Sequence, residues 1–176
     1  MPTFGLIVED ETDEAVLTVL IEKCRRSRSI ALKTRRCRGT VLGKFRGVAI
    51  ELHRRYRVDK VLIVCDADNK DPKRIDRAFR EQGLYDLGFP VELIVIKEEL
   101  EAWLLADPSA LQKVLGVSKA FASPENLRDP KRELMRLMPG AVAYTHQIAR
   151  RIAEEIDLTI LIRRCPAFLR LQSAVR

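Results

Sequence analysis

The chain has 176 residues, of which 47% are hydrophobic, and its 32 Lys and Arg residues against 25 Asp and Glu residues give a net charge of +7. This composition excludes a disordered tail, and the length predicts one domain, or a compact core with an appendage, that folds without disulfide bonds. No apolar run approaches the roughly 18 residues that a membrane-spanning helix needs, and the first residues carry no basic leader. We therefore expect a cytoplasmic protein with no membrane partner.

The cysteines do not point to a metal site of their own. No two of them form a Cys-x-x-Cys pair, and only His53 and His146 could complete a zinc site. We expect no structural zinc, and reduced cysteines in a cytosolic setting.

The charge is segregated along the chain. Residues 1–22 carry six acids and no Lys or Arg, whereas residues 23–60 carry fourteen Lys or Arg and two acids. This pattern fits a phosphate-handling site, because carboxylates hold a divalent metal while Arg and Lys neutralise a polyanion. The alternative is a solvated surface with uneven charge, so the basic excess alone is weak evidence for a nucleic-acid partner.

Strand-like and helix-like segments alternate in the first part of the chain. The predicted order is a strand at 3–8, a helix at 13–24, a weaker strand at 30–34, a helix at 43–56, a strand at 60–65, a helix from Asp71-Pro72 to near Gly83, and a strand at 91–96. This alternation predicts βαβ units, and so an α/β fold with a parallel sheet covered by helices on its faces.

After residue 96 the pattern is helical only. Helix starts are predicted at Asp107-Pro108, Ser123-Pro124 and Asp129-Pro130, with the first helix ending at Gly116, and two more helices are expected at 144–156 and 158–171. We expect a Rossmann-like sheet of about four strands in residues 1–97 and a helical appendage at 98–176. No flexible linker separates the two, so the appendage should pack on the sheet domain.

Acidic residues follow three of the predicted strands: Glu9 the first, Asp66 and Asp68 the third, and Glu98, Glu99 and Glu101 the fourth. The carboxyl ends of parallel strands share one edge of a sheet, where ligands collect. Asp66 and Asp68 leave their strand with a period of two, so both carboxylates can face one side and share a hard cation such as Mg²⁺. Glu98 and Glu101 should share a helix face, with Glu99 pointing elsewhere.

Simpler roles compete with metal binding. Asp66 and Asp68 could form a turn or a cap, although their pairing after an apolar strand favours metal ligation. Glu101 alone would fit an exposed position on an amphipathic helix. Four acids interact favourably with the dipole of the first helix, and most of them are expected to be solvated residues and not ligands: Asp10, Glu11, Asp13 and Glu14.

Two segments resemble the Toprim domain of topoisomerases, primases and overcoming-lysogenization-defect nucleases: Gly5-Leu6-Ile7-Val8-Glu9 with Thr12-Asp13, and Val61-Leu62-Ile63-Val64-Cys65-Asp66-Ala67-Asp68. Further segments resemble a family of small prokaryotic Toprim-like proteins of unknown function, so that the likeness covers nearly the whole chain. These are Glu101-Ala102-Trp103-Leu104-Leu105-Ala106-Asp107, Asp129-Pro130-Lys131, Tyr144 and Cys165-Pro166-Ala167-Phe168.

The resemblance implies that Glu9 is the general acid/base, that Asp66 and Asp68 are Mg²⁺ ligands, and that Glu101 is a further acid of the site. The chain departs from the family patterns at three positions. Asp10 stands where the Toprim pattern usually has glycine, His146 where a lysine is expected, and Ala167 where a serine is expected.

These features together predict phosphodiester chemistry on DNA or RNA that depends on Mg²⁺ or Mn²⁺, with hydrolysis by a Toprim-type nuclease as the leading reaction. Glu9 would move the proton, and Glu9 and Glu101 would join Asp66 and Asp68 as candidate metal ligands. The candidate nucleic-acid-binding residues are Arg25, Arg26, Arg28, Arg35, Arg36, Arg38, Lys70, Lys73 and Arg74.

Three alternatives stay open. A receiver domain of a signalling pathway would share the start Ile7-Val8-Glu9-Asp10-Glu11 and use Asp66 as its phosphorylated residue, but Asp68 and the helical tail are foreign to that fold. A non-catalytic module would bind nucleic acid or a partner ATPase through the basic segment. A nucleotidyl or phosphoryl transferase would use the same metal site as a nuclease.

Overall fold

A four-stranded, all-parallel sheet in the order β2-β1-β3-β4 is the centre of the protein, as shown by a computed structural model that describes residues 1–25 and 30–176. The strands are β1 (Thr3–Val8), β2 (Ala31–Arg36), β3 (Lys60–Asp66) and β4 (Val91–Ile96). The α/β fold predicted from the sequence is therefore confirmed. Arg26 and Arg28 lie outside the described residues.

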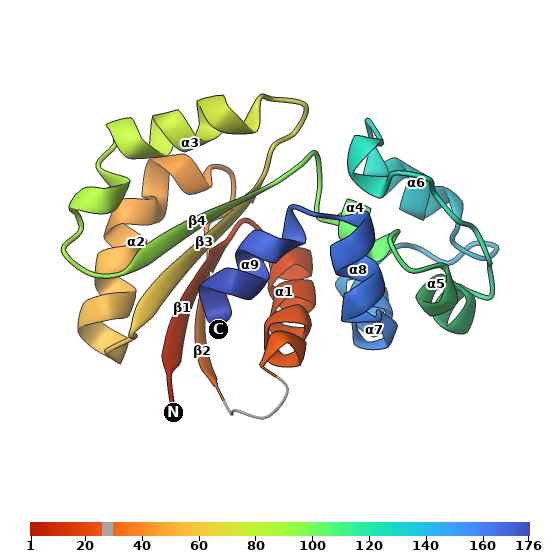
Figure 1. Cartoon of the computed structure of the whole chain (residues 1–176), viewed down its shortest axis with the longest axis horizontal. Helices are drawn as coiled ribbons and strands as arrows, with labels where there is room; N and C mark the ends of the chain where they lie inside the picture. Colours follow the sequence, from red (N-terminus) through yellow and green to blue (C-terminus); the bar gives the residue numbers. More distant parts are fainter. Residues whose placement is uncertain (26–29) are drawn as a thin grey trace.

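Helices cover both faces of the sheet (Figure 1). Helix α1 (Glu11–Cys24) packs on one face, and α2 (Val41–Tyr56) and α3 (Pro72–Glu81) pack on the other. Because successive strand residues point to opposite faces, Leu6 and Val8 join the core on the α1 side, whereas Ile7 joins the core on the α2 side. The central strands β1 and β3 are therefore mainly apolar, whereas the edge strand β2 carries Lys33, Arg35 and Arg36 and has no fully buried residue.

The helix boundaries follow from capping residues that the sequence makes visible. The Asp71 side chain accepts a hydrogen bond from the Lys73 N–H at the start of α3, and Pro72 occupies the first turn, where it costs no intrahelical bond. Gly116 ends α5 (Pro108–Leu115) in the left-handed conformation, with φ 74°. Thr40 caps α2, so this helix begins two residues before the predicted start at residue 43.

The remainder of the chain is helical: α4 (Glu101–Leu104), α5, α6 (Pro130–Arg136), α7 (His146–Glu155), α8 (Leu158–Arg164) and α9 (Phe168–Val175), with two short 3₁₀ turns, η1 (Leu84–Asp86) and η2 (Pro124–Asn126). Two expectations were wrong. The expected helix at 158–171 is divided into α8 and α9, since Pro166 cannot donate a backbone hydrogen bond. Ser123-Pro124 begins only the turn η2.

The carboxyl-terminal helices share one hydrophobic core with the sheet. Residues of α1, β4, α7 and α9 belong to the same buried cluster, and the rings of Trp103 and Phe168 meet edge to face with centroids 5.1 Å apart. The Arg164 guanidinium donates to the Ala106 carbonyl at 3.0 Å and so ties α8 to the end of α4. In Figure 1, α9 returns beside α1 and the sheet, close to the strands.

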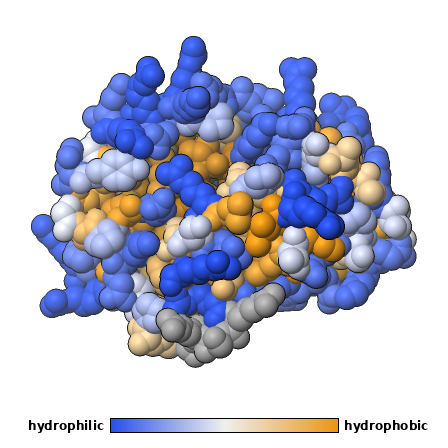
Figure 2. Space-filling view, in the orientation of Figure 1, coloured by the Kyte–Doolittle hydropathy of each residue, from blue (hydrophilic) through white to orange (hydrophobic). Residues whose placement is uncertain are grey.

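The surface is mainly hydrophilic, with apolar side chains along the exposed edge of β4 and where α9 meets α8 (Figure 2). Leu169 of α9, for example, is 44% exposed. Among the described residues, no helix has the length and apolar character needed to cross a bilayer. The four cysteines are all free thiols: Cys24, Cys37, Cys65 and Cys165.

The shared core predicts a single unfolding transition. Ile152 of α7 is fully buried in the cluster that contains α1, so Ile152→Ala should lower the free energy of unfolding of the whole chain by about 2–5 kcal/mol. Urea unfolding followed by far-UV circular dichroism and by fluorescence of Trp103, the only tryptophan, should give coincident curves.

The control is Val142→Ala, because Val142 is 50% exposed and its change should stay within about 0.5 kcal/mol. Two separate transitions, with the loss confined to one, would contradict a shared core.

Candidate functional site

The strand order reverses direction between β1 and β3, since β2 lies on one side of β1 and β3 lies on the other. In open parallel sheets, ligands bind beyond the carboxyl ends of the strands at such a switch point. Glu9 directly follows β1, and Asp66 is the last residue of β3. In Figure 1 this edge of the sheet lies at the top of the view, between α3 and α6.

A small hollow of about 160 Å³ at this edge is lined by carboxylates from three strand ends, together with one lysine; we call it the acidic pocket. Its lining residues are Glu9, Asp10, Thr12, Asp13, Asp66, Asp68, Glu99, Glu101 and Lys131. The four predicted catalytic residues, Glu9, Asp66, Asp68 and Glu101, are therefore brought together in one place. Five further residues of the pocket were not among the predicted site residues.

The loops after β3 and β4 are tied to each other, and this fixes the position of Asp68. The Ala67 N–H donates to the Ile96 carbonyl at 2.9 Å, and the Asp68 N–H donates to the Glu98 carbonyl at 3.0 Å. Asp68, Asn69 and Glu98 all have positive φ values, of 49°, 61° and 60°. Non-glycine residues in this left-handed region cost conformational energy, and they cluster at functional sites.

Burial and the charge of neighbouring acids raise the pKa of several carboxylates of the acidic pocket. Burial, and then the negative charge of Asp13 and Glu101, raises the pKa of Asp66 well above its usual value. Burial raises the pKa of Glu9 as well, with Asp68 as the largest charge contribution. Such mutual repulsion at the end of a buried strand is what a divalent cation would relieve.

Glu101 is buried, with 4% of its surface exposed, so its alternative role as an exposed helix residue is wrong. The Tyr144 hydroxyl donates to Glu101 Oε1 at 3.1 Å. Burial nevertheless raises the pKa of Glu101, even though this hydrogen bond and the charge of Lys131 favour the ionised form. Tyr144 thus holds the orientation of a carboxylate that faces the acidic pocket.

Glu99, not Glu98, accompanies Glu101 in the pocket, which corrects the expected helix face. Helix α4 begins only at Glu101, so the three-residue helical spacing does not extend back to Glu98. Glu98 Oε2 accepts instead from the Asn69 N–H at 2.9 Å. Glu99 Oε2 accepts from the Lys131 N–H at 2.8 Å, which brings the start of α6 to the pocket.

Asp13 is the main residue that the sequence interpretation missed. Most of the first-turn acids, a group that includes Asp13, were expected to be solvated, but burial and then the charge of Asp10 raise the pKa of Asp13 to about 7. Asp10 and Asp13 form a capping box, in which Asp13 Oδ2 accepts from the Glu9 and Asp10 N–H groups at 3.2 Å. The three-residue spacing of these two acids was the available signal, because a capping box turns the second side chain back toward the strand end.

The chain departs from the family patterns at Asp10, His146 and Ala167. Only Asp10 lines the acidic pocket. Asp10 has extended backbone, with φ −135°, and caps α1, so this turn needs no glycine. His146 Nδ1 lies 3.5 Å from Glu11 Oε2, at the start of α1. Ala167 precedes α9 and does not line the acidic pocket.

The donor set of the pocket fits Mg²⁺ or Mn²⁺, since hard divalent cations prefer carboxylate oxygens. Asp66 is the first candidate metal ligand, because burial and the neighbouring acids disfavour its ionised carboxylate. Within residues 1–25 and 30–176, no group of three or more His, Cys, Asp or Glu side chains is already arranged around a metal position. Metal binding would require side-chain rotation; Asp68 is exposed and Glu9 is half-buried.

The predicted basic residues are distributed over different parts of the protein. Lys70 and Arg74 line a larger hollow beside the acidic pocket, whereas Lys73 is exposed on α3 outside it. Arg36 pairs with Glu14 at 3.1 Å, near the start of α1. Arg38 is exposed just before α2.

Two of the basic residues do not reach the acids. Arg25 follows α1 near the amino ends of the strands, away from the acids. Its guanidinium donates to the Val175 carbonyl at 2.5 Å. Arg35 pairs with Glu51 at 3.1 Å and lies 5.0 Å from the centroid of the Tyr56 ring, against α2. Arg25 therefore lies away from the acidic pocket, and its predicted role in nucleic-acid binding stays a prediction.

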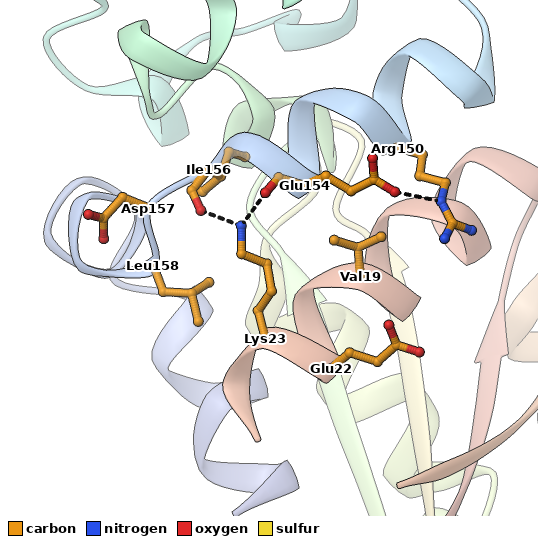
Figure 3. A pocket seen from close by; sticks show the side chains of 8 residues that line it. All are labelled: Val19, Glu22, Lys23, Arg150, Glu154, Ile156, Asp157 and Leu158. Carbon is orange, nitrogen blue, oxygen red and sulfur yellow. Dashed lines mark hydrogen bonds and ion pairs between the residues drawn. The ribbon is translucent and has the colours of Figure 1, made fainter. Parts of the chain in front are cut away.

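Another hollow, of about 630 Å³, lies between the second half of α1 and the end of α7 (Figure 3). Lys23 points across it, and the Lys23 ammonium donates to the Ala153, Glu154 and Ile156 carbonyls at 3.1, 2.7 and 2.6 Å. A cation at this position satisfies carbonyls that have no partner at a helix end. Lys23 therefore joins α1 to the end of α7 at this hollow. None of the residues that line the acidic pocket lines it.

Comparison with known families places the chain in one of them. Residues 8–176 match the family described as Domain of unknown function (DUF4276), so the protein belongs to this family. Neither the curated proteins nor the solved structures include a match. The matched residues include all four predicted catalytic acids and Tyr144.

The crowding around Asp66 predicts a stability effect that depends on pH. The folded-state pKa of Asp66 lies above its ordinary value of 3.8, so ionisation costs stability as the pH rises through this interval. Asp66→Asn should therefore be more stable than wild type at neutral pH without metal, and the difference should vanish as the pH falls to about 4. Thermal unfolding over a pH series measures this difference.

Mg²⁺ should reverse the ranking. Wild type should gain about 2.7 kcal/mol at a Mg²⁺ concentration one hundred times its Kd, and Asp66→Asn should gain less. If Asp66→Asn is less stable than wild type at every pH without metal, ionised Asp66 is held by favourable contacts and the crowding argument is wrong.

Proposed function

We propose that this protein hydrolyses phosphodiester bonds of nucleic acid with the help of Mg²⁺ or Mn²⁺ bound at the acidic pocket. The observation that carries the proposal is the group of carboxylates from three strand ends at the switch point of the sheet, where burial and neighbouring acids raise the pKa of Asp66 well above its usual value. Perturbed carboxylates in a hollow at this position mark a functional site more often than a structural one.

Asp66 and Asp68 would hold the cation, with Glu101 as a further ligand that Tyr144 orients. A bound Mg²⁺ supplies charge neutralisation for the phosphoryl group and lowers the pKa of water. Glu9 is the proton-transfer group, because burial and Asp68 raise its pKa toward the range where a carboxylate can both take up and release a proton. Lys131 contributes positive charge on the other side of the pocket.

The resemblance to Toprim domains supports this assignment. The Toprim pattern contains a glutamate after the first strand and an Asp-x-Asp pair after a later one, and Glu9, Asp66 and Asp68 stand at these places and line one pocket. The relation would make this family a branch of small Toprim-like proteins. This resemblance concerns the sheet and its acids. The crowding of the carboxylates supports a metal site independently of this resemblance.

The substrate would reach the pocket past Lys70 and Arg74, which lie beside the acids and can contact phosphates. Arg38 and Lys73 are exposed close to this entrance and could extend the contact along a strand. A partner ATPase that delivers or remodels the nucleic acid remains compatible with this arrangement.

Cleavage assays test the proposal. Labelled DNA and RNA oligonucleotides, single-stranded and annealed, should be cut in Mg²⁺ or Mn²⁺ and left intact in EDTA. Glu9→Gln and Asp66→Asn should each lower the rate by about 100-fold or more, because the first removes the proton-transfer group and the second removes the charge of a proposed metal ligand. Asp86→Asn is the matched control, since Asp86 is an exposed acid in η1, before β4 and at the opposite edge of the sheet.

Each other outcome has a defined meaning. Salt-sensitive binding that survives Asp66→Asn, with no cleavage, would replace the nuclease with a non-catalytic binding module. Attachment of a labelled nucleotide to an acceptor would replace hydrolysis with nucleotidyl transfer. Cleavage that is equal in wild type and Glu9→Gln would contradict the role of Glu9.

A further inference from the structure

The larger hollow beside the acidic pocket, which Lys70 and Arg74 line, shares part of its wall with that pocket; we call it the side cavity. It has a volume of about 620 Å³, within the range of roughly 300–1,000 Å³ that small-molecule sites occupy. Glu9, Asp66 and Asp68 line both hollows, so a group in the side cavity lies next to the proposed metal ligands.

The inner wall of the side cavity is apolar. Val41 and Leu42 come from the start of α2, and Ile75, Ala78 and Phe79 come from one face of α3. Phe79 is buried against Phe45, with ring centroids 5.0 Å apart, and this contact holds the wall rigid. A site for a metal ion or a phosphate alone would have no use for such a wall.

The rim of the side cavity carries positive charge. Lys70 and Arg74 line it from the loop after β3 and the first turns of α3. Among the described residues, neither side chain forms a salt bridge or donates a hydrogen bond, although the charge of Lys70 acts on Glu9. Both cations can therefore contact an anion in the cavity. Helix α2 also begins at the cavity and has no acid in its first turn, so its amino-terminal dipole is not neutralised there.

A ligand that complements all three features has an apolar, flat part and a phosphate at one end. We propose that the side cavity binds one nucleoside of a single-stranded nucleic acid, next to the phosphate that is cut. The base lies against Leu42 and Ile75, and Lys70 and Arg74 contact its phosphates. This inference rests on the proposed function and adds the strand form of the substrate.

The geometry also excludes a base-paired nucleotide from the cavity. A base inside a duplex is stacked on both sides and paired along its edge, so it can enter a pocket only after it leaves the stack, at a cost of a few kcal/mol. Single-stranded oligonucleotides should therefore be preferred to the same sequence in a duplex. The preference comes from the cavity and not from the acids.

Binding of AMP, compared with ribose 5-phosphate, tests the proposal without any cleavage step. Calorimetric titration in Mg²⁺ should give AMP an affinity about tenfold or more above that of ribose 5-phosphate, because only AMP buries a base. Ile75→Trp fills the cavity and should remove this preference, while Mn²⁺ binding stays unchanged. Val142→Trp, at a 50% exposed position, is the control that should keep it.

Arg74→Gln provides a second variant, because Arg74 is exposed on α3 and its replacement leaves the core intact. It should weaken AMP and ribose 5-phosphate to a similar extent, since both carry the phosphate. Equal affinity of wild type for the two ligands, binding of neither, or an AMP preference that survives in folded Ile75→Trp would overturn the proposal. Oligonucleotides that stay uncut while the AMP preference is present would count against the nuclease alone.

Discussion

Asp66 is held among other carboxylates in a poorly solvated corner where the strand order of the sheet reverses, and the functional account depends on that crowding. The strand that carries it is buried on both faces, so its end cannot move away from Glu9 on the neighbouring strand. Burial and then the charges of Asp13 and Glu101 raise the pKa of Asp66. A divalent cation at the acidic pocket, as we propose, would relieve this repulsion.

The site belongs to the whole chain and not to the sheet domain alone. Glu101 and its hydrogen-bond partner Tyr144 come from the helical part, and Lys131 approaches from the start of α6. The same helices share the core of α1 and the sheet, so a change that loosens the packing of α7 also disturbs the acidic pocket. The family match over residues 8–176 includes the acids of the sheet and these helices.

The sequence predicted the strands, most helix starts and the four central acids, because these depend on local signals such as apolar runs and Asp-Pro caps. It failed where the outcome depended on tertiary contacts. In the sequence, Asp13 cannot be told apart from other acids of a first helical turn. Its capping box directs its side chain toward the acidic pocket. Glu98 has a positive φ, so the expected helical spacing does not extend to it, and Glu99 lines the acidic pocket where Glu98 was expected. Arg25 and Arg38 are close in sequence, yet α1 carries Arg25 to the far edge of the sheet.

The most direct test of the central claim is anomalous X-ray scattering from crystals of the protein soaked in Mn²⁺. The account predicts a manganese peak in the acidic pocket, bonded to Asp66 and to at least one of Glu9, Asp68 and Glu101, and no such peak in Asp66→Asn crystals. Manganese that is absent from the pocket, or that binds there equally in both proteins, would contradict the claim that crowding around Asp66 creates a metal site.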